Sequence, residues 1–507
     1  MQINVLEYFT GGALKKCPGK IAVVDHDRNY TFAELDGFAR NCAASILKRT
    51  RALNRPVAVF LPKGATTIIS NLGILYTGNC YANLDLKSPP ERLKAILQNL
   101  EASLVITASV HVPVLLQAGV PENQLLLVET FLAPEANGTA GAMPACWENV
   151  IDTDPLCIIH TSGSTGIPKG VALNHRSTID FMDWVFERLG LDGSEVIGSL
   201  SPFYFDIYTL EIYLCLAKGS TLVIIPEMCA AFPAKLLEFM AAQKISFIFW
   251  VPTIMVNIAN QDLLATHRLE SLKEVFFAGE VFPIRHLNYW RRHIPQARFI
   301  NLYGPIEITV DCTYFIVDRE FGDDEKLPIG FPCRNTDVLI LGENNQPVQG
   351  EEPGELCVRG SSLAMGYWNN PDRTARAFVQ NPLNRHYPEV IYRTGDLVHR
   401  NSRGEIMFIG RKDFQIKHLG YRIEMGEIEH AVLQVDGIRN ACVVYAPERK
   451  EITLFFESDK ELSPAAIRER LGTFIPKYMF PTVFHRMEQL PRNPNGKIDR
   501  QKLAELV

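Results

Sequence analysis

The stretch HTSGSTGIPKG, residues 160–170, decides how the rest of the chain is interpreted. It contains three glycines, four hydroxyl side chains and one lysine. The apolar runs LCII (156–159) and VAL (171–173) on either side are typical of strands, so the stretch is predicted to join two strand ends. Glycine N–H groups, hydroxyls and a lysine can together surround a phosphate. A flexible surface turn and a phosphate-binding loop both fit this stretch on its own.

Two common nucleotide-binding loops do not match it. The P-loop pattern GxxxxGK[ST] needs Ser or Thr after the lysine, whereas Gly170 follows Lys169, and the pattern GxGxxG is missing from the stretch. A P-loop kinase and a Rossmann dehydrogenase are therefore poorly supported.

Composition limits the class of protein further. A chain of 507 residues is expected to form at least two domains, and 47% hydrophobic with 21% charged residues is ordinary for a soluble globular protein. A net charge of −6 gives no support to a nucleic-acid partner. Eleven cysteines without a CxxC pair argue against a disulfide framework or zinc cluster and favour a reducing compartment.

Neither a signal peptide nor a membrane span is expected. The N-terminus has no long apolar run, and the most apolar stretch, residues 245–259, is too short for a bilayer and contains Pro252. That stretch is predicted to be a buried strand followed by a loop and a helix. We expect a cytoplasmic protein without a membrane partner.

Short β-branched runs alternate with amphipathic stretches, which indicates α/β layers with mostly parallel sheets. The runs are 21–25, 56–62, 104–107, 221–226 and 247–252. After about residue 320 the chain is rich in turn residues and short strands, typical of a small β-subdomain. Beyond GRKDF (410–414), helices are expected at 426–434 and 464–472 with strands between them. The prediction is a large N-terminal domain, 1–411, and a small mobile α+β C-terminal lid domain, 412–507.

Further motifs, in order along nearly the whole chain, accompany the opening stretch. They are CYANLD (80–85), FDIYTLEIY (205–213), NLYGPIEITV (301–310), GELCVRG (354–360), YRTGDL (392–397), GRKDFQIKHLGYRIEMGEIE (410–429), FIPKYMFP (474–481) and NPNGKIDR (493–500). With them the chain resembles the adenylate-forming enzymes: acyl-CoA synthetases, luciferases and the adenylation domains of non-ribosomal peptide synthetases. Among these it is most similar to stand-alone enzymes such as D-alanine–carrier protein ligases.

The resemblance implies ATP and Mg²⁺ as cofactors and gives roles to individual residues. The residues matched to ATP binding are Thr161, Ser162, Gly163, Ser164, Thr165, Gly166, Lys169, Tyr303, Gly304, Asp396 and Arg411. Glu307 matches the magnesium ligand, and Lys497 matches the lysine that bridges the substrate carboxylate and the α-phosphate. Asp413 matches the hinge about which the small domain turns, bringing GYRIEMGE (420–427) to face the second substrate. Ile306 departs from the pattern, because threonine is usual there, and this removes a hydroxyl near the phosphates.

Asp206 is the residue that decides the substrate class. In members that activate amino acids, the aspartate at this position pairs with the substrate ammonium; the competing interpretation is an N-cap for the following helix. The matched substrate positions are Asp206, Ile207, Leu210, Phe249, Phe276, Ala278, Leu302, Val310 and Asp311, with Lys497. Bulky Phe249 and Phe276 indicate a small amino acid such as alanine, while Asp311 also fits serine or a basic side chain. Ala278 stands where D-alanine ligases have cysteine, so D-alanine is not assigned.

The predicted activity is ATP-dependent formation of an aminoacyl-AMP from a small amino acid, followed by transfer to the phosphopantetheine thiol of a separate carrier protein. Two alternatives stay open. An acyl- or aryl-CoA ligase would use an acid without an amine and free CoA. A weakly active nucleotide-binding homologue would retain ATP binding but little turnover.

Overall fold

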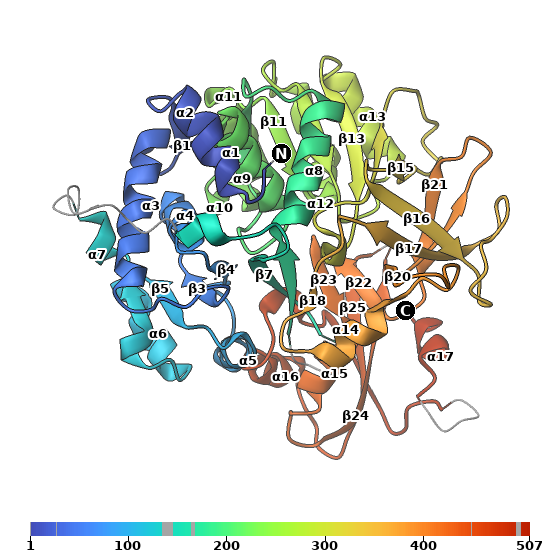
Figure 1. Cartoon of the computed structure of the whole chain (residues 1–507). Helices are drawn as coiled ribbons and strands as arrows, with labels where there is room; N and C mark the ends of the chain where they lie inside the picture. The colour runs from blue at the N-terminus through green and yellow to red at the C-terminus, as the bar shows by residue number, and fades with distance from the viewer. Residues whose placement is uncertain (1, 27, 134–145, 164–167, 448, 493–497) are drawn as a thin grey trace.

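The β-branched runs form the strands of two large sheets (Figure 1). The structure is a computed structural model that describes residues 2–26, 28–133, 146–163, 168–447, 449–492 and 498–507. The strands predicted at 21–25, 56–62, 104–107, 221–226 and 247–252 are all present, shortened by up to two residues at the C-terminal end.

The first large sheet has seven strands in the order β18-β8-β7-β4-β3-β5-β6. Its strands are β3 Pro56–Phe60, β4 Cys80–Asn83, β5 Leu104–Thr107, β6 Leu125–Leu127, β7 Pro155–Thr161, β8 Lys169–Asn174 and β18 Gly366–Tyr367. The pairs from β7 through β4, β3 and β5 to β6 are parallel, while β8 runs antiparallel to β7 and β18. The strands that the flanking apolar runs predict are present, and the structure shows that β7 and β8 pair antiparallel.

The second large sheet has nine strands in the order β15-β14-β13-β12-β11-β9-β10-β1-β2. Its strands are β1 Ile21–Val24, β2 Asn29–Thr31, β9 Val196–Ser199, β10 Thr221–Ile224, β11 Phe247–Trp250, β12 Glu274–Phe277, β13 Arg298–Tyr303, β14 Thr313–Ile316 and β15 Phe331–Pro332. The strands from β1 to β13 are parallel, with antiparallel pairs only at the two edges. The expectation of mostly parallel sheets is confirmed.

Buried helices join the two sheets into one core. The principal ones are α3 Phe32–Leu47, α4 Ala65–Tyr76, α8 His175–Leu189 and α9 Ile207–Lys218. A single hydrophobic cluster contains residues of these helices and of both sheets. Helix α9 is predominantly apolar, is buried on all sides and contributes to this cluster, as expected for a helix between layers. The other helices are α1 Leu6–Tyr8, α2 Leu14–Lys16, α5 Pro90–Leu100, α6 Val112–Gln117, α7 Glu129–Leu132, α10 Glu227–Ala231, α11 Pro233–Ala242, α12 Pro252–Asn260, α13 Ile284–His293 and α14 Pro371–Ala377.

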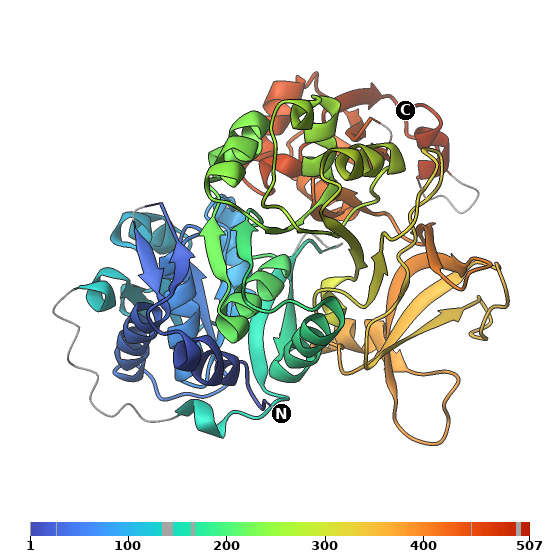
Figure 2. The ribbon, with the colours of Figure 1, turned by 90° about the horizontal axis from the view of Figure 1, so that it is seen from above.

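The turn-rich region after residue 320 forms an antiparallel β-subdomain of five strands. Its strands are β16 Thr336–Leu341, β17 Gly354–Gly360, β19 Phe378–Gln380, β20 Val390–Arg400 and β21 Ile406–Arg411. Figure 2 shows this subdomain to one side of the two large sheets.

The C-terminal part begins with a hairpin and continues as a small α+β unit with its own core. Its elements are β22 Gln415–His418, β23 Tyr421–Glu424, α15 Met425–Val432, β24 Ile438–Ala446, β25 Glu451–Ser458, α16 Pro464–Leu471, β26 Val483–Met487 and α17 Arg500–Ala504. The two predicted helices are confirmed within two residues at each end. The fold class is confirmed, while the boundary at 411/412 and the mobility of the small domain stay predictions.

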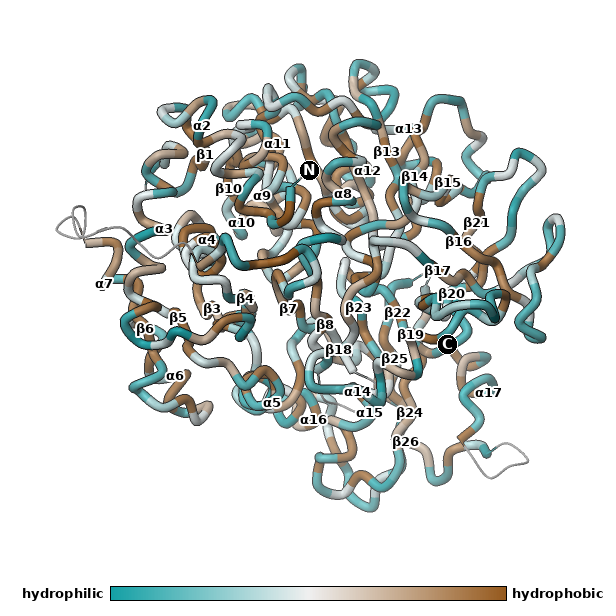
Figure 3. The backbone as a smooth tube through the Cα atoms, viewed as in Figure 1, coloured by the Kyte–Doolittle hydropathy of each residue, from teal (hydrophilic) through white to brown (hydrophobic). Residues whose placement is uncertain are grey.

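Hydrophobic residues concentrate along the central strands and inner helices, and hydrophilic residues along the outer loops (Figure 3). Within the described residues, no helix combines the length and apolarity needed to cross a membrane.

Candidate active site

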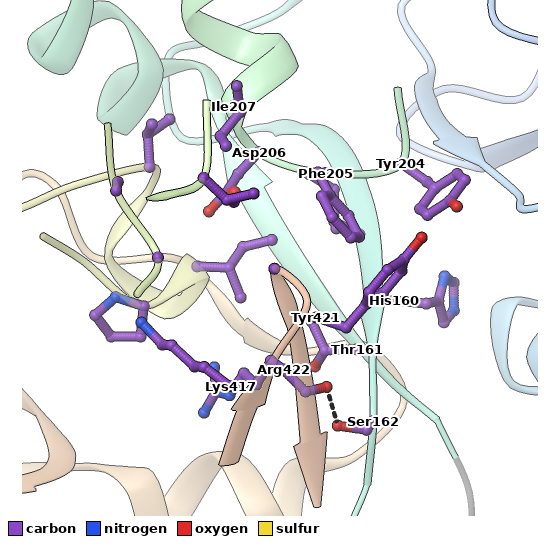
Figure 4. Close-up of a pocket in the computed structure, with 18 of the residues that line it drawn as sticks. His160, Thr161, Ser162, Tyr204, Phe205, Asp206, Ile207, Lys417, Tyr421 and Arg422 are labelled. Atoms are coloured by element: carbon purple, nitrogen blue, oxygen red, sulfur yellow. Dashed lines mark hydrogen bonds between the residues drawn. The ribbon is translucent and has the colours of Figure 1, made fainter. Parts of the chain in front are cut away.

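A cavity lies where the large domain meets the β22–β23 hairpin (Figure 4). The end of β7 contributes His160, Thr161 and Ser162, and the segment before α9 contributes Tyr204 to Ile207. The hairpin contributes Lys417 and Arg422 from the opposite side. Segments from three regions of the sequence therefore enclose one space.

The start of the 160–170 stretch is fastened to the C-terminal part of the chain. The Ser162 hydroxyl donates to the backbone oxygen of Arg422 at 2.6 Å and accepts from the Glu424 N–H at 3.1 Å. The Gly163 N–H donates to the Glu427 carboxylate at 3.0 Å. Ser164, Thr165 and Gly166 lie outside the described residues.

Glu307 is completely buried, and both of its carboxylate oxygens have protein partners. Oε2 accepts from Arg422 at 2.6 Å, while Oε1 accepts from the Tyr367 hydroxyl at 2.8 Å and lies 3.4 Å from the Lys169 ammonium. Burial by itself raises the pKa of this carboxyl, but the Arg422 guanidinium and the Lys169 ammonium outweigh it and hold the pKa well below its usual range. Burial lowers the pKa of Lys169 to about 8.

This geometry bears on the predicted magnesium site. Among the described residues, no cluster of three or more His, Cys, Asp or Glu side chains is arranged to hold a metal. With Arg422 on Glu307, the carboxylate does not fit a cation ligand in this arrangement of the hairpin. The assignment of Mg²⁺ to Glu307 stays a prediction and requires Arg422 to leave.

Asp396 is the second carboxylate paired with an arginine. Asp396 on β20 faces Arg411 on β21 in the sheet register, and the Arg411 guanidinium donates to it at 2.6 Å. The Tyr303 hydroxyl also donates to Asp396. Arg411 makes two further bonds, of 2.6 and 2.8 Å, to Asp413. We call Glu307 and Asp396 the paired carboxylates.

Asp206 and Asp311 differ from them, and we call these two the unpaired carboxylates. Neither lies within 4.0 Å of a Lys, Arg or His nitrogen among the described residues, although both line the cavity. Asp206 occupies the N-cap position of α9, but its side chain makes no capping hydrogen bond. The N-cap interpretation is therefore not supported by the geometry.

Protein encloses both unpaired carboxylates, and their pKa values rise as a result. Asp206 is partly accessible from the cavity, yet desolvation raises its pKa to about 6. The backbone N–H groups of Asp206 and Ile207, together with Lys417, oppose this rise. Burial, then the charge of Asp206, raises the pKa of Asp311 well above its usual range. Perturbed carboxyls that share a cavity are typical of a binding or catalytic site.

Most of the other predicted residues also reach the cavity. Ile207, Phe249, Ala278, Val310, Gly304 and the departing residue Ile306 line it. Leu210, Phe276 and Leu302 are buried in the core instead and do not line it. Lys497 lies outside the described residues, between Arg492 and Ile498, which form an isolated bridge.

Comparison with known proteins identifies the family of this chain. The model of the family "AMP-binding enzyme" matches residues 12–368, and that of "AMP-binding enzyme C-terminal domain" matches residues 427–497. The chain belongs to the AMP-binding enzymes. The resemblance seen in the motifs is thereby confirmed at the level of the family.

Several relatives of this AMP-binding enzyme are synthases by name. It is 29% identical to Zwittermicin A synthase ZmaJ of Bacillus cereus, over 97% of this chain and 93% of that protein. It is 30% identical to Tyrocidine synthase 1 of Brevibacillus parabrevis, over 96% of this chain but only 44% of that protein. The structure of holo-PA1221, an NRPS protein containing adenylation and PCP domains, shares the fold with a TM-score of 0.83 at 24% identity, covering 100% of this chain and 84% of that one.

Several residues of the AMP-binding enzyme that hold the hairpin were not singled out from the sequence. Arg92 on α5 forms a buried ion pair with Glu427 on α15, and the Gly420 N–H donates to Glu280 at 2.7 Å. Leu419 and Gly420 both have positive φ, as a two-residue type I′ hairpin turn requires. The motif GRKDFQIKHLGYRIEMGEIE contained the signal for the hairpin, but its partners Arg92 and Glu280 have no local signal.

Proposed function

We propose that this AMP-binding enzyme activates a small amino acid and transfers it to the thiol of a separate carrier protein. A carboxylate oxygen of the amino acid forms a bond to the α-phosphorus of ATP, while the bond from that phosphorus to pyrophosphate breaks. The aminoacyl-AMP then reacts with a phosphopantetheine thiol, giving a thioester and AMP. The observation that carries the proposal is the single cavity lined by both Asp206 and the start of the 160–170 stretch.

Each part of the cavity has a role in this proposal. Asp206 would pair with the substrate ammonium, because an enclosed carboxylate without a partner is costly. Lys169 and the 160–170 stretch would hold the phosphates, and Asp396 with Arg411 the ribose, beside Tyr303 and the adenine. Lys497 would place positive charge between the substrate carboxylate and the α-phosphate, where negative charge develops.

The position of the hairpin supports a reaction in two arrangements of the small domain. Arg422 forms an ion pair with the Glu307 carboxylate, which the nucleotide-bound magnesium would need as a ligand. The arrangement described here is therefore suited to the thiol step, with β22–β23 facing the second substrate. We propose that rotation about Asp413 withdraws Arg422 and brings Lys497 to the site for the first step.

The relatives support the amino acid and the carrier as substrates. ZmaJ and Tyrocidine synthase 1 are synthases of the same family. PA1221 is described as combining adenylation and PCP domains in one protein. For this AMP-binding enzyme we propose a carrier on another polypeptide.

ATP–pyrophosphate exchange tests the first step. The substrates are a panel of L- and D-amino acids together with acids that lack an amine. We expect exchange that depends on one small amino acid. Exchange only with amine-free acids would contradict the proposal and favour an acyl- or aryl-CoA ligase. ATP binding without any exchange would favour the weakly active homologue and make Ile306→Thr the first variant to examine.

A further inference from the structure

The charged groups lining the cavity leave Asp206 and Asp311 without a cation. Arg411 is engaged by Asp396 and Asp413, Arg422 by Glu307, and Arg92 by Glu427. Lys417 is the remaining lining cation among the described residues. It makes no ion pair within 4.0 Å with them, and its ammonium lies 5.9 Å from the centre of the Tyr303 ring. Figure 4 shows it on the hairpin, across the cavity from Asp206.

Asp311 is the more unusual of the two unpaired carboxylates. Only 2% of its surface is exposed, and its Oδ2 atom is buried without any hydrogen-bond partner. It is close enough to Asp206 for the charge of Asp206 to raise its pKa. Two neighbouring carboxylates without cations destabilise the empty site, so the fold itself gains nothing from them.

The backbone nevertheless holds Asp311 firmly in the cavity wall. The two residues before it, Thr309 and Val310, have φ values of +56° and +66°, which β-branched residues rarely adopt. Gly304 packs directly against this segment, since a Cβ there would lie 2.5 Å from the Asp311 Cα. Strain of this kind is typical of segments that place a functional side chain.

We infer that the substrate is a short diamino acid, with its α-ammonium on Asp206 and its side-chain ammonium on Asp311. The inference rests on the proposed function and narrows its substrate. Two ammonium groups neutralise two carboxylates one for one, whereas alanine would leave Asp311 unpartnered. The hydroxyl of a substrate such as serine can be bound by a neutral hydrogen-bonding group. A second buried carboxylate would cost desolvation free energy without a cation to offset it.

The remaining walls limit the length of the side chain. Phe249, Ile207 and Val310 are apolar, and they line the same cavity as the two aspartates. They offer apolar contacts to methylene groups but no further charge. The two ammonium groups of the substrate must therefore both lie on the two aspartates, which favours a short chain between them. L-2,3-diaminopropionate, L-2,4-diaminobutyrate and L-ornithine are the candidates.

Matched pairs of substrates test the inference on the unaltered enzyme. ATP–pyrophosphate exchange is compared between 2,3-diaminopropionate and serine, and between 2,4-diaminobutyrate and homoserine, which differ only in amine and hydroxyl. Alanine and ornithine complete the set. We expect kcat/KM to favour one diamino acid over its hydroxyl analogue on the order of 100-fold or more. Equal or better exchange with serine, homoserine or alanine would overturn the inference and leave the proposed function standing, whereas no exchange with any amino acid contradicts the proposed function itself.

The Asp311→Asn variant tests whether Asp311 causes the preference for a diamino acid. It should lower kcat/KM for the preferred diamino acid on the order of 100-fold while exchange with alanine is retained or increased. Asp318→Asn, at an exposed position shortly after β14, is the matched control and should behave as the unaltered enzyme. Equal losses for the diamino acid and for alanine would contradict a role for Asp311 in recognising the side chain. The substrate pairs decide the matter even if Asp311→Asn does not fold.

Discussion

The paired and the unpaired carboxylates occupy the same cavity but have opposite surroundings. Glu307 and Asp396 each accept a 2.6 Å bond from an arginine and a further bond from a tyrosine. Asp206 and Asp311 have no ion pair with any described residue. The first two therefore stabilise this arrangement of the hairpin, whereas the second two have no ion pair within 4.0 Å among the described residues and are favoured only by backbone N–H groups and the more distant Lys417. This difference is the basis of our proposal that Asp206 and Asp311 bind the substrate.

The largest expected effect follows from removing the carboxylate of Asp206. Asp206→Ala should reduce amino-acid-dependent exchange by about 10²–10⁴-fold, because the substrate ammonium would lose its buried partner at a cost of about 3–5 kcal/mol. Thermal unfolding should change little, since no described cation depends on Asp206. Unchanged exchange would contradict a role of Asp206 in binding the substrate. A large loss of stability would mean that the fold depends on Asp206 as it does on the paired carboxylates.

Substitution of a paired carboxylate should act on stability. Glu307→Gln leaves the Arg422 guanidinium and the Lys169 ammonium without their shared partner. We expect the free energy of unfolding, measured in urea, to fall by about 3 kcal/mol.

Asp311→Asn is the matched comparison for stability and should have the opposite sign. The pKa of Asp311 is raised in the folded protein. As the pH rises above the pKa that this carboxyl has in the unfolded chain, the carboxyl therefore destabilises the fold increasingly. Neutral asparagine should therefore raise the free energy of unfolding at pH 7, and raise it less near pH 4. A similar loss for Glu307→Gln and Asp311→Asn would mean that Asp311 has a partner in solution.

The smallest expected effect is a pH dependence. Asp206 has a pKa of about 6 and must be ionised to hold an ammonium, so kcat/KM for the amino acid should fall about tenfold per unit below that pH. Lys169 has a pKa of about 8 and must be protonated to hold phosphate, so a second fall is expected above it. A flat profile between pH 5 and 7 would contradict the role of Asp206.

The sequence by itself determined much of this protein. Alternating β-branched runs and amphipathic helices predicted the α/β layers, and the change in texture after residue 320 predicted the β-subdomain. The ordered motifs indicated the family and the residues of the site, since each motif carries its side chains at fixed spacing. Glu307, Asp396, Arg411 and Asp206 could all be selected in this way.

Only the tertiary structure decided which of these charges meet. Arg422 pairs with Glu307, and Arg92 with Glu427, because the hairpin and α15 dock against the large domain although the partners are 115 and 335 residues apart in sequence. Packing within the large domain separates Ile207 and Phe249, which line the cavity, from Leu210, Phe276 and Leu302, which pack in the core. Charge pairing depends on distance through space, which local sequence patterns do not encode. For that reason the two aspartates left without a cation became visible only in the folded chain.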